Sequence, residues 1–163
     1  DKDGNPIKCE QGKCENTTFD WTWTQHTAFR IDSKSDKRFV YLTAFDNGDG
    51  RAFKQPENPR KKYSRAVMYR IDEKKGTVEQ IWEYGKNRGH ALYSAITSSV
   101  EYEADKDSLL VYWASIGVQD KKGVNPVLTE FRRGGKDPVF EMQIRGSMGY
   151  RALAIDLVKA FKE

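Results

Sequence analysis

The sequence predicts an all-β protein that forms part of a β-propeller, and three observations support this. Apolar and polar residues alternate with a period of two over most of the 163 residues, which is typical of strands with one buried face. Clusters of turn-forming residues, such as EKKG at 73–76, separate these stretches. The pattern of strands and turns also occurs twice along the chain.

The expected strands follow one another with short connections, and EKKG closes a hairpin between two of them. Only the final LVKAFKE, at 157–163, has a pattern that suits a helix. The strands are expected near residues 23–32, 38–46, 65–72 and 77–84, then 95–104, 108–116, 126–132 and 138–145, with a last one near 150–157.

The internal repeat is visible when the sequence is shifted along itself. A shift of 70 residues places 26–45 over 96–115 without a gap, and a shift of 61 places 66–85 over 127–146. The hydrophobic pattern and the turns agree, although few residues are identical. A unit of four antiparallel strands that occurs twice is typical of propeller blades. A β-sandwich is the alternative, and the internal repeat counts against it.

These observations divide the chain into four segments. We expect a lead-in loop at 1–20, one blade at 21–85, a second blade at 86–149, and a closing strand with a C-terminal tail at 150–163. A propeller needs at least about four blades. We therefore expect further blades to precede Asp1, and the last strand to complete a blade that begins elsewhere.

Composition excludes two classes of partner. The 28 basic and 24 acidic residues give a net charge of +4, and both signs are mixed along the chain. Nucleic-acid binding would instead require a basic stripe with exposed aromatic residues. No apolar run approaches the roughly 20 residues that span a bilayer. We expect neither a nucleic acid nor a membrane as partner.

Cys9 and Cys14 are the only cysteines, and their spacing fits neither a C-x-x-C redox motif nor half of a zinc site. A disulfide across so short a loop would contribute about 2 kcal/mol. It would also indicate an oxidising compartment. The alternative is a pair of free thiols in a cytosolic loop.

His26 lies on the first strand of the first unit, between Gln25 and Thr27. In a propeller the first strand of each blade lines the central channel. The 70-residue shift places Ile96 at the position of His26 in the second unit, and Thr97 at that of Thr27. From the residues alone, His26 is either a hydrogen-bonded structural histidine or a nucleophile or acid–base group at the channel mouth.

Three stretches resemble the C-terminal part of bacterial arylsulfate sulfotransferases. They are DWTWTQHTA at 20–28, FDNGDGR at 45–51, and the segment from YSR at 63–65 through IDEKKGTVEQIWEYGK at 71–86. The resemblance covers most of residues 9–100 and fades after about 118. It implies a six-bladed propeller in a secreted, periplasmic homodimer.

The resemblance also implies a reaction. Such enzymes move a sulfuryl group from an aryl sulfate donor to a phenolic acceptor without a cofactor or metal. Their transient sulfohistidine corresponds to His26, twelve residues after Cys14. Histidine side chains are largely neutral at pH 7, so such a ring can attack sulfur. The family's other catalytic histidines lie in earlier blades, so we expect this chain to be inactive alone. The alternative is a non-catalytic propeller segment that serves as a binding or scaffold module.

Two further residues are candidates for binding substrate. Thr97 would offer a hydroxyl from the neighbouring blade to the sulfuryl oxygens. Arg51 ends a turn at 46–50 and would either touch the anionic substrate or anchor the loop by ion pairing. That turn lacks the residue order of a calcium loop. His90 is expected in a solvated loop between the two units.

Overall fold

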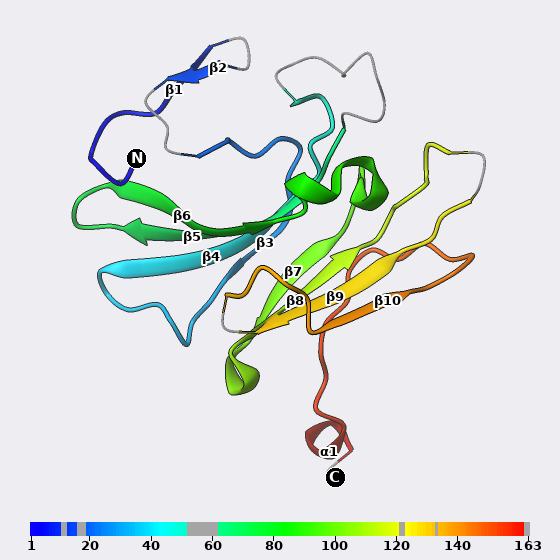
Figure 1. Ribbon diagram of the computed structural model, residues 1–163. Coiled ribbons are helices and arrows are strands. Elements are labelled where there is room, and N and C mark those ends of the chain that lie inside the picture. The colour runs from blue at the N-terminus through cyan, green and yellow to red at the C-terminus, as the bar shows by residue number, and fades with distance from the viewer. Residues whose placement is uncertain (11–12, 16–18, 52–61, 121–122, 133, 162–163) are drawn as a thin grey trace.

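The computed structural model describes residues 1–10, 13–15, 19–51, 62–120, 123–132 and 134–161, and its main feature is a pair of four-stranded antiparallel sheets (Figure 1). The all-β prediction is thereby confirmed. The first sheet consists of β3 (His26–Arg30), β4 (Phe39–Asp46), β5 (Arg65–Asp72) and β6 (Thr77–Tyr84). The second consists of β7 (Ser99–Glu103), β8 (Ser108–Trp113), β9 (Val127–Arg132) and β10 (Phe140–Gln143).

Both sheets have the same connectivity. Each strand pairs with the strand that follows it in the sequence, so β3 and β7 are edge strands, as are β6 and β10. The first sheet lies within residues 21–85 and the second within 86–149, which agrees with the repeat of the sequence. The hairpin at 73–76 joins β5 to β6 as expected.

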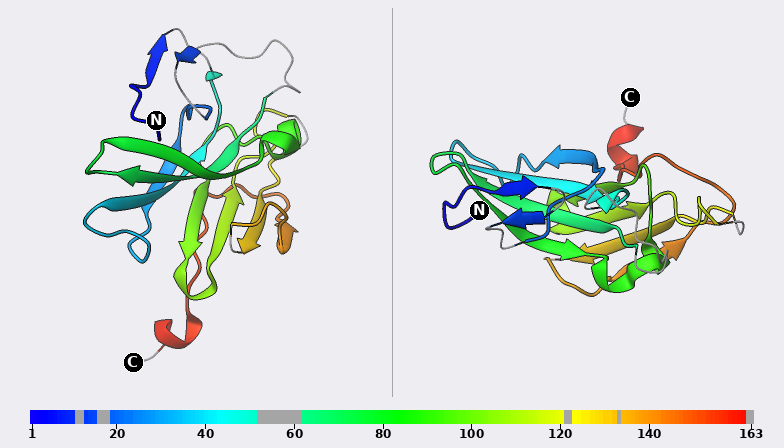
Figure 2. Two further views of the ribbon diagram at one scale, coloured as in Figure 1. Left: turned by 60° about the vertical axis from the view of Figure 1, so that its left-hand side comes forward. Right: turned by 90° about the horizontal axis from the view of Figure 1, so that it is seen from above.

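The core lies between the two sheets, whose arrangement Figure 2 shows from two further sides. Aromatic rings from both sheets meet in this core. Phe45 of β4 packs edge-on against Trp113 of β8 with ring centroids 5.1 Å apart, and Tyr84 of β6 lies 4.4 Å from Phe131 of β9. Such pairs contribute about 0.5–1.5 kcal/mol beyond their buried area. The edge strands β3 and β7 meet at the junction, where the Thr27 hydroxyl donates to the Ser98 carbonyl at 2.6 Å. The sheets do not close into a ring, and the propeller stays a prediction.

The first strand of each sheet begins later than the alternation predicts. The strands expected over 23–32 and 95–104 are confined to β3 and β7. Thr27, Thr97 and Ser98 have positive φ values of 46°, 59° and 87°, which are uncommon for residues other than glycine and interrupt a regular ladder. Thr27 and Thr97 are equivalent in the repeat, so both sheets have the same irregularity at the same place.

The strand predicted near 150–157 is wrong. The segment lies beside β7, and the Ser98 amide donates to the Tyr150 carbonyl at 2.9 Å, but residues 150–157, all of which the structure describes, form no strand. Further along, Ala152 exchanges hydrogen bonds with the Ser99 hydroxyl rather than with its backbone. Side chains of β7 therefore take the place of a strand ladder.

The other elements are short, and they change two expectations. The lead-in segment expected as a loop contains a small hairpin, and His90 lies in a 3-10 helix, where it is half-buried and stacks on Tyr93. In the described residues no helix is long and apolar enough to cross a membrane. These elements are β1 (Lys8–Glu10), β2 (Lys13–Glu15), the 3-10 helices η3 (Lys86–Leu92) and η4 (Ala104–Lys106), and α1 (Leu157–Ala160).

Candidate functional site

His26 is the first residue of edge strand β3, and its side chain is half-buried. It pairs across the sheet with Phe45 near the end of β4, and a bulge follows it in the strand. Two residues after Phe45, Asn47 places its Oδ1 atom 2.6 Å from Nδ1 of the imidazole. The ring is therefore oriented by one partner from the connection that leaves β4.

The amide of Asn47 joins the two sheets. Its Nδ2 atom donates to the carbonyl of Ser94 at 2.6 Å and to the carbonyl of Thr97 at 3.0 Å, both in the segment that enters β7. The residue has no exposed surface. Because both ends of the amide have partners, this buried polar side chain is satisfied.

Thr97, the predicted substrate hydroxyl, lies on the other side of the same amide from His26. Its backbone carbonyl accepts from Asn47, its own hydroxyl donates to the carbonyl of Ile96 at 2.6 Å, and the residue as a whole is half-buried. Ile96, the repeat equivalent of His26, is 42% exposed. The structure thus brings the predicted nucleophile and the Thr97 segment together, and a contact of the hydroxyl with substrate stays a prediction.

A cluster of buried serines supports this junction. The Ser64 hydroxyl donates to the Asn47 carbonyl at 2.7 Å and accepts from the Ser94 amide at 2.9 Å. The Ser94 hydroxyl lies 2.8 Å from those of Ser98 and Ser115. All four serines are fully buried. Networks of this kind hold their members in one arrangement when every polar group has a partner.

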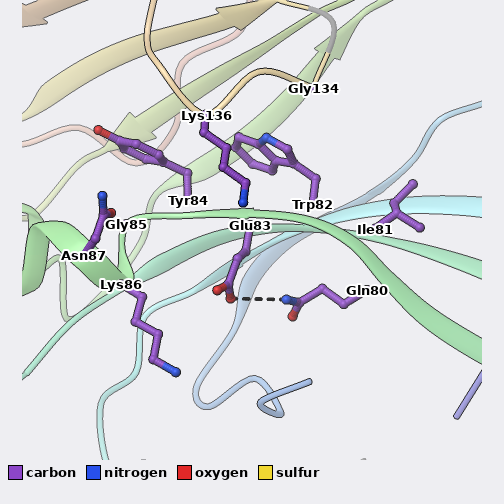
Figure 3. Close-up of a pocket in the computed structure, with 10 residues that line it drawn as sticks. All are labelled: Gln80, Ile81, Trp82, Glu83, Tyr84, Gly85, Lys86, Asn87, Gly134 and Lys136. Atoms are coloured by element: carbon purple, nitrogen blue, oxygen red, sulfur yellow. Dashed lines mark hydrogen bonds between the residues drawn. The ribbon is translucent and has the colours of Figure 1, made fainter. Parts of the chain in front are cut away.

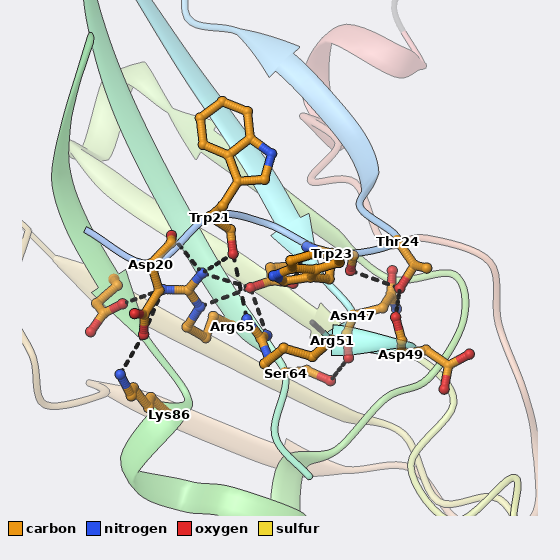
Figure 4. Close-up of polar contacts among 12 residues, drawn as sticks. Asp20, Trp21, Trp23, Thr24, Asn47, Asp49, Arg51, Ser64, Arg65 and Lys86 are labelled. Atoms are coloured by element: carbon orange, nitrogen blue, oxygen red, sulfur yellow. Dashed lines mark hydrogen bonds and ion pairs between the residues drawn. The ribbon is translucent and has the colours of Figure 1, made fainter. Parts of the chain in front are cut away.

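Arg51 takes part in an ion-pair network around Asp46 at the end of β4 (Figure 4). The Asp46 Oδ2 atom lies 2.8 Å from Nη2 of Arg51 and 2.7 Å from Nη2 of Arg65, while Oδ1 accepts from the backbone amide of Trp23 at 2.9 Å. The Arg51 guanidinium also stacks 4.2 Å from the ring centre of Tyr63. This geometry supports the anchoring alternative for Arg51, and a contact with substrate stays a prediction.

Arg65, the first residue of β5, holds the segment that leads to His26. Its side chain is fully buried, and Nη2 donates to the carbonyls of Asp20 and Trp21 at 3.0 and 3.1 Å. Its Nη1 atom pairs with Glu83 on β6 at 2.8 Å. Asp20 also pairs with Lys86, and the hydrogen bond from that ammonium lowers the pKa of the Asp20 carboxyl. The approach to β3 is thereby tied to β4, β5 and β6.

Cys9 and Cys14 are opposite each other in the register of β1 and β2. Residues paired directly across an antiparallel ladder have Cα atoms about 4.5–5.5 Å apart, which lies within the range that disulfides span. Their side chains lie outside the described part of the structure, so the disulfide stays a prediction.

A groove of about 590 Å³ lies along β6 (Figure 3), and His26 is not among the residues that line it. Trp82 forms part of its wall and donates from its indole to the Gly135 carbonyl at 2.9 Å. Glu83, Lys86 and Lys136 give it charges of both signs. No histidine is among the residues that line it, so it adds nothing to the site at His26. In the described residues no group of three or more metal-ligating side chains could hold a metal ion.

Sequence reasoning missed Asn47 and Arg65. Asn47 lies in DNGDG, whose composition indicates only a turn, and its partners are 21 to 50 residues away. Arg65 stands at the start of an apolar strand, where its burial depends on Asp46 from the neighbouring strand. No local pattern could have identified either residue.

Comparison with known proteins agrees with the sequence motifs around His26. Residues 3–151 match the family model described as Arylsulfotransferase (ASST). The arylsulfate sulfotransferase AssT of Escherichia coli O6:H1 (strain CFT073) is 55% identical over 121 residues, which are 74% of this chain and 19% of the relative. The AssT of Lelliottia amnigena is 52% identical over 119 residues, or 72% of this chain and 19% of the relative. The chain therefore spans about a fifth of the length of these curated relatives.

Proposed function

Because the chain belongs to the arylsulfotransferase family, we propose that it is the C-terminal portion of an enzyme that moves a sulfuryl group from a phenolic sulfate ester to a phenol through His26. The observation that carries this proposal is the setting of His26. The ring is half-buried on an edge strand, within motifs shared with the family, and its Nδ1 atom is held by the fully buried Asn47. The hydrogen bond between Nδ1 and Asn47 thus fixes the orientation of the His26 ring.

The proposed reaction has two halves. In the first, a lone pair on the His26 ring attacks sulfur, an N–S bond forms, the S–O bond to the aryl group breaks, and a phenolate leaves. In the second, the oxygen of the acceptor phenol attacks the same sulfur and the N–S bond breaks. The released phenolate gains one proton and the acceptor phenol loses one, so protons balance over the cycle. Thr97 and Arg51 are proposed to contact the sulfuryl oxygens.

The two sheets are proposed to be blades of a six-bladed propeller, 21–85 and 86–149, followed by the tail 150–163. Their identical connectivity, their repeated irregularity at Thr27 and Thr97, and the meeting of β3 with β7 all support this arrangement. The rest of the protein would supply the remaining blades and the other catalytic groups, so residues 1–163 alone would be inactive. A disulfide between Cys9 and Cys14, a periplasmic location and a homodimer complete the proposal.

The test replaces His26 in the complete protein. His26→Asn is expected to fold but to lose turnover of an aryl sulfate, because Asn can hydrogen-bond yet cannot carry the sulfuryl group. Sulfur-35 from a labelled aryl sulfate should remain on the wild-type protein after rapid quenching, and be absent from the variant. His90→Asn, at the other histidine of this chain, is the matched control and should keep both activity and label.

Two results would contradict the proposal. Activity of His26→Asn within about tenfold of wild type would remove His26 from the mechanism, because loss of a covalent nucleophile costs several powers of ten. Absence of turnover and of label in the wild-type protein would instead favour the non-catalytic binding module.

A further inference from the structure

The orientation of the Asn47 amide is fixed by its partners. Its Nδ2 atom faces the carbonyl oxygens of Ser94 and Thr97 at 2.6 and 3.0 Å, and carbonyl oxygens only accept hydrogen bonds. The reverse orientation would set Oδ1 against both of these oxygens, which repel it, and would remove the hydrogen bond that each of them accepts from Nδ2. The amide nitrogen therefore points to the β7 side, and the amide oxygen points to His26.

This orientation determines which nitrogen of His26 carries the proton. Oδ1 of Asn47 lies 2.6 Å from Nδ1 and can only accept, so Nδ1 must donate. A neutral imidazole has one N–H and one bare nitrogen. With the proton on Nδ1, the lone pair belongs to Nε2.

The backbone of Asn47 is also fixed by hydrogen bonds, which helps to hold its side-chain amide in place. The carbonyl of Asn47 accepts from the Ser64 hydroxyl at 2.7 Å, and that hydroxyl also contacts the Ser94 carbonyl at 3.2 Å. Asn47, Ser64 and Ser94 are all fully buried, so water does not compete for these bonds. The acceptor that faces His26 is thus fixed before any ligand arrives.

We propose that Asn47 is a positioning residue that keeps neutral His26 in the tautomer with hydrogen on Nδ1, so that Nε2 is the atom that takes the sulfuryl group. This inference rests on the proposed function of His26. When Nε2 forms the N–S bond and the S–O bond breaks, the ring becomes a cation that retains its Nδ1–H. No proton leaves the ring, and the bond to Asn47 becomes charge-assisted and stronger. The same contact thus selects the tautomer and stabilises the charged intermediate.

The first test is a measurement on the wild-type protein. The complete protein, labelled with nitrogen-15 in histidine, is studied by NMR at a pH where His26 is neutral, and its signals are those missing from His26→Asn. We expect a protonated, pyrrole-type nitrogen at Nδ1 and an unprotonated, pyridine-type nitrogen at Nε2. The opposite assignment would overturn the proposal without the need for any further variant.

The second test compares two buried substitutions. Asn47→Leu removes the acceptor, so the tautomer signature should weaken and kcat should fall about 10- to 100-fold with little change in KM. Thr43→Val is the matched control, because it removes another fully buried hydrogen bond between the two sheets, from the Thr43 hydroxyl to the Val100 carbonyl at 2.7 Å, and leaves the hydrogen bonds of Asn47 in place. It should keep the tautomer and most of kcat. Equal losses in both variants would show that Asn47 matters only for stability.

The two proposals can fail separately. A protonated Nδ1 in a protein that never retains label on His26 would refute the nucleophile and leave the Asn47 contact as a structural one. Label on His26 together with a protonated Nε2 would refute the role of Asn47 and leave the proposed function intact.

Discussion

At the scale of single residues, Arg65 is a fully buried charged side chain that depends on several partners. Its guanidinium and the carboxylate of Asp46 are both fully buried, and their closest atoms are 2.7 Å apart. A buried ion pair contributes little net stability, but loss of one partner leaves the other charge in a medium of low dielectric constant. The same guanidinium also holds two carbonyls of the segment that enters β3. Its removal should therefore disturb both the core and the approach to His26.

Arg65→Met is expected to lower the free energy of unfolding by an amount toward the low end of about 3–5 kcal/mol, because Asp46 loses its fully buried partner and keeps only Arg51. Arg70→Met is the control, because Arg70 lies on the same strand and pairs with Glu79 on β6 at 2.7 Å, but both side chains are partly exposed. An exposed pair contributes about 0–1 kcal/mol. Urea denaturation monitored by circular dichroism gives both values. Similar losses in the two variants would contradict the importance of burial at Arg65.

At the scale of elements, one carboxylate connects the β5–β6 hairpin to the start of β4. Asp72 accepts from the backbone amides of Lys74 and Lys75 at 3.1 and 3.2 Å, and from the Arg38 guanidinium at 2.7 Å. The hydrogen bond from Arg38 is the main cause of the lowered pKa of Asp72, and the two backbone amides add to it. The turn and the register of two strands thus depend on the ionised form of this side chain.

This dependence predicts how acid affects stability. A lowered pKa means that the stabilisation by Asp72 is complete above its ordinary pKa of 3.8 and is lost as the pH falls through the folded-state value below that. Urea denaturation between about pH 6 and pH 2.5 should therefore show a steeper acid loss for wild type than for Asp72→Asn. Asp105→Asn, at an exposed site, controls for the change in net charge. Parallel pH profiles for wild type and Asp72→Asn would disprove the linkage.

A comparison of the expected and observed strands shows which elements the sequence could predict. Strands β4, β5, β6 and β9 match their expected ranges to within a residue, because alternation and turn residues act locally. The segment 150–157 has the same alternation, yet Leu153 and Ile155 are 46% and 70% exposed. Alternation indicates which face of a strand would be buried, but it does not supply a partner strand, and here the available edge offers side chains instead.

The residues of the candidate site also differ in whether the sequence could identify them. His26 could be selected because an imidazole inside a β-strand pattern is unusual, and because the surrounding motifs resemble a family. Its partner Asn47 could not, because a contact over 21 residues depends on how β4 ends and how the next sheet packs against it. The positive φ values at Thr27 and Thr97 could likewise not be predicted from the sequence, since β-branched residues favour regular strands.

At the scale of the whole molecule, the two sheets are held together by an aromatic core and by the buried serines beside Asn47. Gly85 lies where these two regions meet, at the end of β6. It has a φ of 117°, and a Cβ atom there would come within 2.5 Å of the Ser64 carbonyl and 2.6 Å of the Trp113 ring. Trp113 has little freedom to move, because its indole donates to Thr129 at 2.9 Å and it has no exposed surface.

Gly85→Ala is therefore expected to lower the free energy of unfolding by about 2–4 kcal/mol, through backbone strain and overpacking together. Gly76→Ala separates these causes, because Gly76 in the β5–β6 turn also has a positive φ, of 64°, but a Cβ there would meet nothing within 4 Å. It should cost only about 1–2 kcal/mol. Since Gly85 adjoins Ser64, the first variant should also perturb the near-ultraviolet circular dichroism of Trp113 and the His26 signals, while the second should leave both unchanged. Equal costs for the two substitutions, with unchanged spectra in both, would mean that the sheets do not meet at Gly85 as closely as the structure shows.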